Sequence, residues 1–223
     1  MVVKGKVAAA VQVDYVAFKG RAERSRYIVD RFARFLKGKV LDVGCDEAVL
    51  RSLLPDVQYT GVDIGGDPDV RLDLEEIAAF PFADGQFDCV VCADVLEHLD
   101  NLHHVFGELV RVAGAHVLLS LPNNWANARR PVEKGKGRIG HYGLPARPPQ
   151  DRHKWFFGLS EAIEFVKAQQ AQHPISVAEL RVTEKPRPWV VRMARRLRYG
   201  SQERYLNRYA HTLWVVYEKR PEG

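Results

Sequence analysis

The sequence predicts an α/β protein with a doubly wound, mostly parallel sheet of seven strands, helices on both faces and one antiparallel edge strand. Two observations support this class. Short apolar segments alternate with segments of helical spacing as far as residue 122, which is the pattern of parallel strands joined by crossover helices. Two later apolar segments, 175–184 and 209–220, lack a clear crossover helix between them, which predicts the antiparallel edge strand.

The individual elements follow from local spacing. Apolar residues from Tyr27 to Leu36 recur at helical intervals and predict an N-terminal helical segment over 14–37, which Gly38 ends. The stretch "KVLDVG" reads as a buried strand and leads into a short helix that Pro55 closes. Apolar runs predict further strands at 58–64, 69–74, 87–94 and 115–123, and helical spacing predicts helices at 99–113, 159–171 and 189–199.

The chain is expected to be a single domain over residues 1–223. Residues 123–158 are rich in Asn, Gly, Pro and Arg and have no clear period, and a loop of this length is usually functional. The apolar run after Lys4 and Lys6 is too short for an export signal, and three cysteines without a framework suit a reducing compartment. A cytoplasmic location is therefore expected.

Charge is distributed unevenly along the chain. Residues 40–125 carry 16 acidic and 3 basic side chains, whereas the formal net charge of the whole chain is +5. The segments on either side of this acidic centre are therefore strongly basic. This pattern favours an anionic substrate or surface that the flanks approach.

Acidic residues stand at the ends of successive predicted strands. Asp42 closes the first strand, Asp63 follows about twenty residues later in "GVDI", and Asp73 and Asp94 end the next two strands. Because ligands of an open parallel sheet bind beyond the carboxyl ends of its strands, these side chains predict one ligand site. Each acid alone reads equally well as a turn or cap residue, so the prediction depends on their order.

This ordered series resembles the class I S-adenosylmethionine-dependent methyltransferases, in the group that contains many small-molecule enzymes. The matching stretches run from Val40 to Asn123 and are "VLDVGC", "YTGVDI", "RLDLEEIAAFPFADGQFDCVVCADVLEHLDN", "ELVRV" and "HVLLSLPN". The resemblance implies a Rossmann-like fold, S-adenosylmethionine as cofactor and a cofactor site formed by Asp42, Gly44, Cys45, Asp63, Ile64, Asp73, Leu74 and Asp94. In that assignment Asp63 binds the ribose hydroxyls, Asp73 and Leu74 lie near the adenine, and Asp94 closes the methionine end.

The loop after the first strand departs from the family's pattern, because Asp46 and Ala48 stand where two more glycines are expected. A dinucleotide needs glycines there so that a pyrophosphate can approach the helix N-terminus. S-adenosylmethionine carries a sulfonium and an ammonium instead, and acids at 42, 46 and 47 suit a cation. The departure therefore argues against a dinucleotide, while a non-catalytic S-adenosylmethionine-binding homologue stays open as an alternative.

By the same resemblance, 123–158 is an insertion on the acceptor side. His141 and His153 are its candidate catalytic bases, although a loop hydrogen bond is the more frequent role of a single histidine. The histidine spacings predict no metal site. The expected reaction is methyl transfer to a small-molecule acceptor that is anionic, a saccharide or lipid-linked, and methylation of RNA is the alternative enzyme activity.

The segment 189–199 is amphipathic, with Val190, Met193, Ala194 and Leu197 on one face and arginines opposite. The favoured interpretation is that this apolar face covers the sheet. The alternative is peripheral contact with an anionic membrane. The sequence predicts no oligomeric state.

Overall fold

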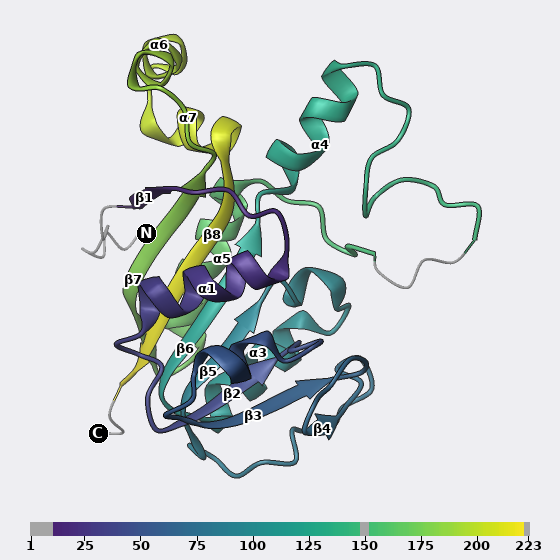
Figure 1. Cartoon of the computed structure of the whole chain (residues 1–223), viewed down its shortest axis with the longest axis vertical. Helices are drawn as coiled ribbons and strands as arrows, with labels where there is room; N and C mark the ends of the chain where they lie inside the picture. Colours follow the sequence, from purple (N-terminus) through teal and green to yellow (C-terminus); the bar gives the residue numbers. More distant parts are fainter. Residues whose placement is uncertain (1–10, 148–151, 221–223) are drawn as a thin grey trace.

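The computed structural model describes residues 11–147 and 152–220. The strands are β1 (Gln12–Tyr15), β2 (Lys39–Val43), β3 (Gln58–Asp63), β4 (Val70–Arg71), β5 (Phe87–Ala93), β6 (Ala113–Pro122), β7 (Ile175–Glu184) and β8 (Ala210–Lys219). The helices are α1 (Arg21–Phe32), α2 (Val49–Leu53), the 3₁₀ turn η1 (Leu96–His98), α3 (Leu102–Val112), α4 (Asn124–Glu133), α5 (Leu159–Gln172), α6 (Trp189–Tyr199) and α7 (Gln202–Tyr209). The strands form one sheet in the order β1-β7-β8-β6-β5-β2-β3-β4 (Figure 1).

The sheet is mostly parallel, as predicted, but it differs from the prediction in two respects. It has eight strands rather than seven, because β1 adds an edge strand parallel to β7. The antiparallel strand β8 lies inside the sheet, between β6 and β7, and not at an edge. The reason is burial on both faces: Leu213 to Tyr217 are at most 1% exposed, as expected for a central strand.

The N-terminal segment is only partly helical. The helix α1 begins at Arg21, whereas the sequence predicted a helical segment from residue 14. The alternating residues before it pair with β7, and Asp14 accepts hydrogen bonds from Tyr27 (2.8 Å) and Arg31 (3.1 Å) of α1. These contacts hold α1 across the sheet, where Tyr27 and Phe32 pack on the ring of Trp214.

Two apolar clusters cover the two faces of the sheet. One contains Ile28, Phe32, Leu50 and Trp214 and lies beneath α1 and α2. The other is larger and includes Phe106 of α3 and Val166 of α5. Helices therefore cover both faces, in agreement with the predicted doubly wound architecture.

The segment 123–158 was expected to be a loop, and that expectation is wrong for its first part. The helix α4 begins directly after β6, where the Asn123 side chain accepts a hydrogen bond from the Ala126 amide at 3.3 Å. An asparagine cap of this kind is a common helix start, and its polar sequence hid the helical period. The described residues from 135 to 147 and from 152 to 158 contain neither helix nor strand.

The helix α6 has the reverse orientation to the favoured interpretation. None of its residues is buried, and Trp189, Val190 and Leu197 are 58–79% exposed. The arginine face points toward the body instead, with Arg192 3.9 Å from the ring centroid of Tyr15 and Arg195 4.3 Å from that of Tyr209. Cation–π contacts thus hold the helix, and its apolar face is left open.

Figure 1 shows α4 and α6 standing beyond the same end of the sheet, which is the end where β6 leads into α4. Among the described residues, no helix combines the length and the apolar character needed to cross a bilayer.

Candidate active site

A cavity of about 700 Å³ opens at the carboxyl ends of β2, β3 and β5, and the start of α1 closes its other side. The eight residues predicted to bind the cofactor all line it: Asp42, Gly44, Cys45, Asp63, Ile64, Asp73, Leu74 and Asp94. The fold therefore brings these side chains together, although their role in binding stays a prediction. The cavity also has walls that the sequence reasoning missed, among them Arg21, Arg24 and Ser25 of α1.

The loop after β2 has the backbone of a glycine loop with fewer glycines. Gly44 has φ +80°, and a Cβ there would lie 2.2 Å from a methyl carbon of Val95, so only glycine fits. Asp46 and Ala48 have φ of 48° and 49°, in the left-handed region that non-glycine residues seldom adopt. The chain therefore keeps the conformation that glycines would give and accepts the backbone strain.

Asp63 fixes this loop from the next strand. One carboxylate oxygen accepts a hydrogen bond from the Asp46 amide at 2.8 Å, and the other accepts one from the Gly65 amide at 3.0 Å. The Asp46 carboxylate forms an ion pair with Arg21 of α1. Each oxygen of Asp63 has a second lone pair, so the side chain can accept further hydrogen bonds from a ligand.

Asp42 lies at the floor of the cavity and is 6% exposed. Burial raises the pKa of Asp42 to about 7, the Tyr59 hydroxyl that donates to it at 2.8 Å opposes the rise, and the charge of Asp63 adds to it. Near neutral pH the carboxyl group is therefore poised between its two protonation states. A cationic ligand above it would favour the charged state.

Asp94 and α1 close the opposite wall. The backbone of Asp94 is left-handed, with φ 54°, and its carboxylate accepts a hydrogen bond from Ser120 and lies 3.0 Å from Arg24. Acids around the cavity and arginines at its rim offer partners for an ammonium, a sulfonium and a carboxylate. Together with the glycine cradle at position 44, these residues fit S-adenosylmethionine.

The two predicted catalytic histidines lie in different positions relative to this cavity. His153 contacts His98, which lines the cavity, with the ring centroids 4.5 Å apart. His141 stacks on His153 at 4.7 Å and lines a separate surface hollow with Arg138 and Arg152. The structure thus brings His153 toward the cofactor cavity and leaves His141 behind it.

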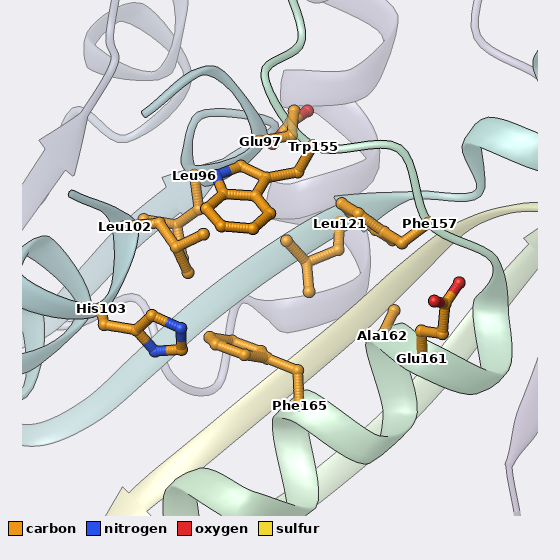
Figure 2. Close-up of a pocket in the computed structure, with 10 residues that line it drawn as sticks. All are labelled: Leu96, Glu97, Leu102, His103, Leu121, Trp155, Phe157, Glu161, Ala162 and Phe165. Carbon is orange, nitrogen blue, oxygen red and sulfur yellow. The ribbon is translucent and has the colours of Figure 1, made fainter. Parts of the chain in front are cut away.

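A second, smaller cavity of about 200 Å³ also borders the turn η1, and Figure 2 shows the side chains that line it. Its walls are mainly apolar: Leu96, Leu102, Leu121, Trp155, Phe157, Ala162 and Phe165, with Glu97, His103 and Glu161 at its polar positions. Trp155 is fixed over it by a hydrogen bond from its indole nitrogen to the Leu99 carbonyl at 2.7 Å. The two cavities share η1, which contributes His98 to the first and Glu97 to the second.

The missed residues differ in how visible they were. Arg21 and Arg24 are three apart at the start of a helix, so their common direction was readable once the helix start was known. Trp155 reaches η1 from the far end of an irregular segment, and no local pattern places it there.

Comparison with known proteins shows the family of the chain. A family model described as a methyltransferase domain matches residues 19–166. The ubiquinone biosynthesis O-methyltransferase of Pseudomonas aeruginosa is 31% identical over 113 residues, covering 43% of this chain and 49% of the relative. The chain therefore spans about half the length of the curated relatives that it matches.

Solved structures give the same fold at low identity. The small RNA methyltransferase HEN1 superimposes with a TM-score of 0.57 at 18% identity, covering 90% of this chain and 25% of that chain. An S-adenosylmethionine-dependent methyltransferase from Archaeoglobus fulgidus gives a TM-score of 0.54 at 16% identity, covering 91% of this chain and 96% of that chain. The family model spans well over half of the sequence. The chain therefore belongs to the methyltransferase domain family, as a class I, S-adenosylmethionine-dependent member with a Rossmann-like sheet.

Proposed function

We propose that this chain transfers the methyl group of S-adenosylmethionine to a small-molecule acceptor whose apolar part enters the cavity beneath Trp155. One observation carries the proposal: a polar cavity lined by four strand-end acids adjoins an apolar cavity across the single turn η1. Donor and acceptor sites of a methyltransferase must be adjacent, because the transfer is an in-line displacement that depends on alignment.

In this proposal the cofactor residues divide the ligand between them. Asp63 accepts hydrogen bonds from the ribose hydroxyls, and Leu74 and Ile64 flank the adenine. Ile64 is 61% exposed at the mouth of the cavity, which leaves apolar surface for a ring to cover. Asp42 and Asp94 face the cationic end, and Arg24 is positioned for the carboxylate.

The acceptor's nucleophile belongs on the His98 side of the cofactor cavity, where His153 also lies. A proton-bearing acceptor needs help there to lose its proton. We assign this role to the His98–His153 pair and no longer to His141, because His141 lies behind the pair.

The acceptor class is proposed from the shape and charge of the surroundings. The apolar cavity suits a ring or a short aliphatic group, and the curated relative that matches is named as an O-methyltransferase of ubiquinone biosynthesis. An oxygen nucleophile on a ring or lipid-linked acceptor is therefore the first class to screen.

We also propose that the outward face of α6 contacts an anionic membrane surface. Trp189, Val190 and Leu197 are exposed on this face. The helix carries no acidic residue, and two of its four arginines, Arg196 and Arg198, are exposed. An exposed apolar stripe with flanking cations is what interfacial helices present to lipid. It would also bring a lipid-linked acceptor to the end of the sheet where the cavities open.

The membrane proposal predicts that the protein cosediments with phosphatidylglycerol-containing vesicles and that Leu197→Ser weakens this binding. Leu144→Ser is a matched control, because Leu144 is fully exposed but lies in the irregular segment. Equal sedimentation of both variants, or none by the unaltered protein, would exclude α6 as the contact.

The enzymatic proposal is tested by calorimetric titration with S-adenosylmethionine and S-adenosylhomocysteine, followed by an acceptor screen. Asp63→Ala is expected to weaken binding by about 10- to 100-fold, because hydrogen bonds to a carboxylate are worth about 1.5–3 kcal/mol. Asp56→Ala, an exposed acid before β3, is the control.

The outcomes separate the alternatives. Cofactor binding without turnover on any acceptor would favour a non-catalytic homologue. Binding to RNA that falls steeply with salt would favour RNA as the acceptor. A well-folded protein that binds neither cofactor nor product would refute the proposal.

A further inference from the structure

We propose that Glu97, His98 and His153 form a site for a divalent transition-metal ion between the cofactor cavity and the apolar cavity. The metal site itself stands on the geometry of these three residues. Its assignment as the group that activates the acceptor oxygen rests on the proposed function. The spacing of these residues in the sequence gave no sign of it, since 55 positions separate His98 and His153.

The three side chains converge. One potential ligand atom from each lies within 4.8 Å of the other two, and a Glu97 carboxylate oxygen is 4.0 Å from His98 Nε2. A metal with bonds of about 2.1 Å holds neighbouring ligand atoms about 3–3.5 Å apart. Shifts of about an ångström, within the reach of side-chain rotation, would complete the coordination.

Contacts outside the cluster orient its ligands as metal sites require. His98 Nδ1 lies 3.2 Å from the Arg152 carbonyl oxygen, which can only accept a hydrogen bond. The tautomer that donates from Nδ1 leaves the lone pair on Nε2, the nitrogen that lies 4.0 Å from the Glu97 carboxylate. A second nitrogen that donates to a carbonyl is the usual companion of a metal-binding imidazole.

His153 and Glu97 are held in a similar way. The Tyr142 hydroxyl lies 2.6 Å from His153 Nδ1, so the tautomer that donates there leaves a lone pair on Nε2. The backbone carbonyl of Glu97 accepts a hydrogen bond from the Lys154 amide at 2.8 Å. This hydrogen bond joins η1 to the segment that carries His153. It therefore fixes the ligands of the two segments relative to each other.

The electrostatic surroundings favour a cation. The Glu97 side chain is 1% exposed, and the interaction of a carboxylate with a dication strengthens where water is excluded. The charge of the neighbouring Lys154 is directed elsewhere, to Glu75 and to Asp100 at 2.7 Å. The nearby ammonium group is thus already balanced by two other carboxylates.

The donor set indicates the kind of ion. Two imidazoles and one carboxylate suit manganese, cobalt, iron or zinc, whereas magnesium and calcium prefer oxygen ligands throughout. Three protein ligands leave further coordination positions open, which is the arrangement of a catalytic rather than a structural site.

The position of the site gives it a role. His98 lines the cofactor cavity and Glu97 lines the apolar cavity, so an ion held by both would meet an acceptor hydroxyl at their boundary. Coordination lowers the pKa of that hydroxyl, and its proton leaves to water. The acceptor oxygen then bonds to the methyl carbon as the carbon–sulfur bond breaks, with the electron pair staying on sulfur to give S-adenosylhomocysteine.

The test is a titration of the whole chain with Mn²⁺. Binding is measured as the loss of the electron paramagnetic resonance signal of the free ion. Mn²⁺ is the chosen probe because it binds thiolates weakly, and the chain has three free cysteines. One ion per chain is expected to bind, and His153→Gln is expected to weaken binding by at least about 10- to 100-fold. His104→Gln, an exposed histidine on α3, should bind as the unaltered protein does.

Glu97→Gln provides a second variant that keeps the shape of the side chain and removes its charge, in case His153→Gln fails to fold. The same samples are titrated with S-adenosylmethionine without metal. Cofactor binding without Mn²⁺ binding would overturn the metal site and leave the proposed function standing. Mn²⁺ binding that both His153→Gln and Glu97→Gln retain would also overturn it. Metal binding without cofactor binding would leave the site but remove its role.

Discussion

The cofactor cavity and the cluster of Glu97, His98 and His153 beside it, here called the histidine cluster, are assembled from the chain in different ways. The acids of the cavity close successive parallel strands, so each is placed by its own strand end. The cluster joins η1 to His153, and α3, β6, α4 and residues 134–152 lie between them in the chain. The position of each acid follows from the end of its own strand, and this holds for every strand of a parallel sheet. The cluster instead depends on the contact that one distant segment, which carries His153, makes with η1. We therefore expect changes in the cavity to alter cofactor binding and changes in the cluster to alter turnover.

The largest expected effect is on turnover. Once an acceptor is found, His153→Gln is expected to lower kcat by about 10²- to 10⁴-fold, because the group that prepares the nucleophile is lost. Its affinity for S-adenosylmethionine should stay unchanged, since His153 does not line the cofactor cavity. Single-turnover kinetics and calorimetry measure the two quantities separately. A parallel loss of cofactor affinity would show that the two regions act as one.

The next effect is on the cavity's loop. Gly44→Ala places a Cβ 2.2 Å from a Val95 methyl carbon and keeps φ +80°. The free energy of unfolding should therefore fall by about 2–4 kcal/mol, and the affinity for the cofactor should fall as well. Gly137→Ala meets no atom within 4 Å and should change stability little. Urea unfolding measures both variants. A stable Gly44→Ala protein that binds the cofactor normally would contradict the packing argument.

Asp42 gives a pH-dependent effect of comparable size. Its pKa is about 7 in the folded chain, above the value of about 3.9 in an unfolded chain, so the folded state holds the extra proton between these values. Its contribution to stability is therefore fully present below about pH 4 and is lost as pH rises through 7, by about 1.4 kcal/mol per unit. Asp42→Asn should flatten this slope, because the amide keeps the shape of the neutral acid.

The same group should make cofactor binding tighten as pH rises through about 7, because a cation stabilises the Asp42 carboxylate. Calorimetry at several pH values on the unaltered protein and on Asp42→Asn measures this. An affinity that is flat with pH in both proteins would remove Asp42 from the cationic end of the site.

The sequence allowed the fold class and the cavity's acids to be predicted, because both depend on short-range patterns. A strand end and its acid are read within six residues, as at Asp63 in "YTGVDI". The position of β8 inside the sheet could not be read, since pairing partners are set by burial on both faces and not by spacing. The orientation of α6 was predicted wrongly because amphipathic spacing does not say which face of a helix turns inward. Arg192 and Arg195 turn inward here because they contact the rings of Tyr15 and Tyr209.

The histidine cluster shows the same limit at the candidate site. His153 was predicted as a candidate catalytic base, but its partners on η1 were not among the predicted site residues. Contacts between distant segments bring them together, among them the backbone bond from Lys154 to Glu97 and the ring contact with His98. Contacts between segments so far apart in the chain leave no local signature.

The smallest expected effect concerns Ala48, a residue of the same loop with a left-handed backbone. Ala48→Gly relieves about 1–2 kcal/mol of backbone strain at φ 49°. It also frees the unfolded chain, at a cost of about 0.5–1 kcal/mol, and removes a buried methyl group worth about 0.8 kcal/mol. These terms nearly cancel, so the unfolding free energy should change by less than about 1 kcal/mol. Ala48→Val, which adds a β-branch to the same backbone, should instead be clearly destabilising. If Ala48→Gly were strongly destabilising, the methyl group of Ala48 would be essential to the loop, and its departure from the family's glycine would be an adaptation of packing rather than a tolerated strain.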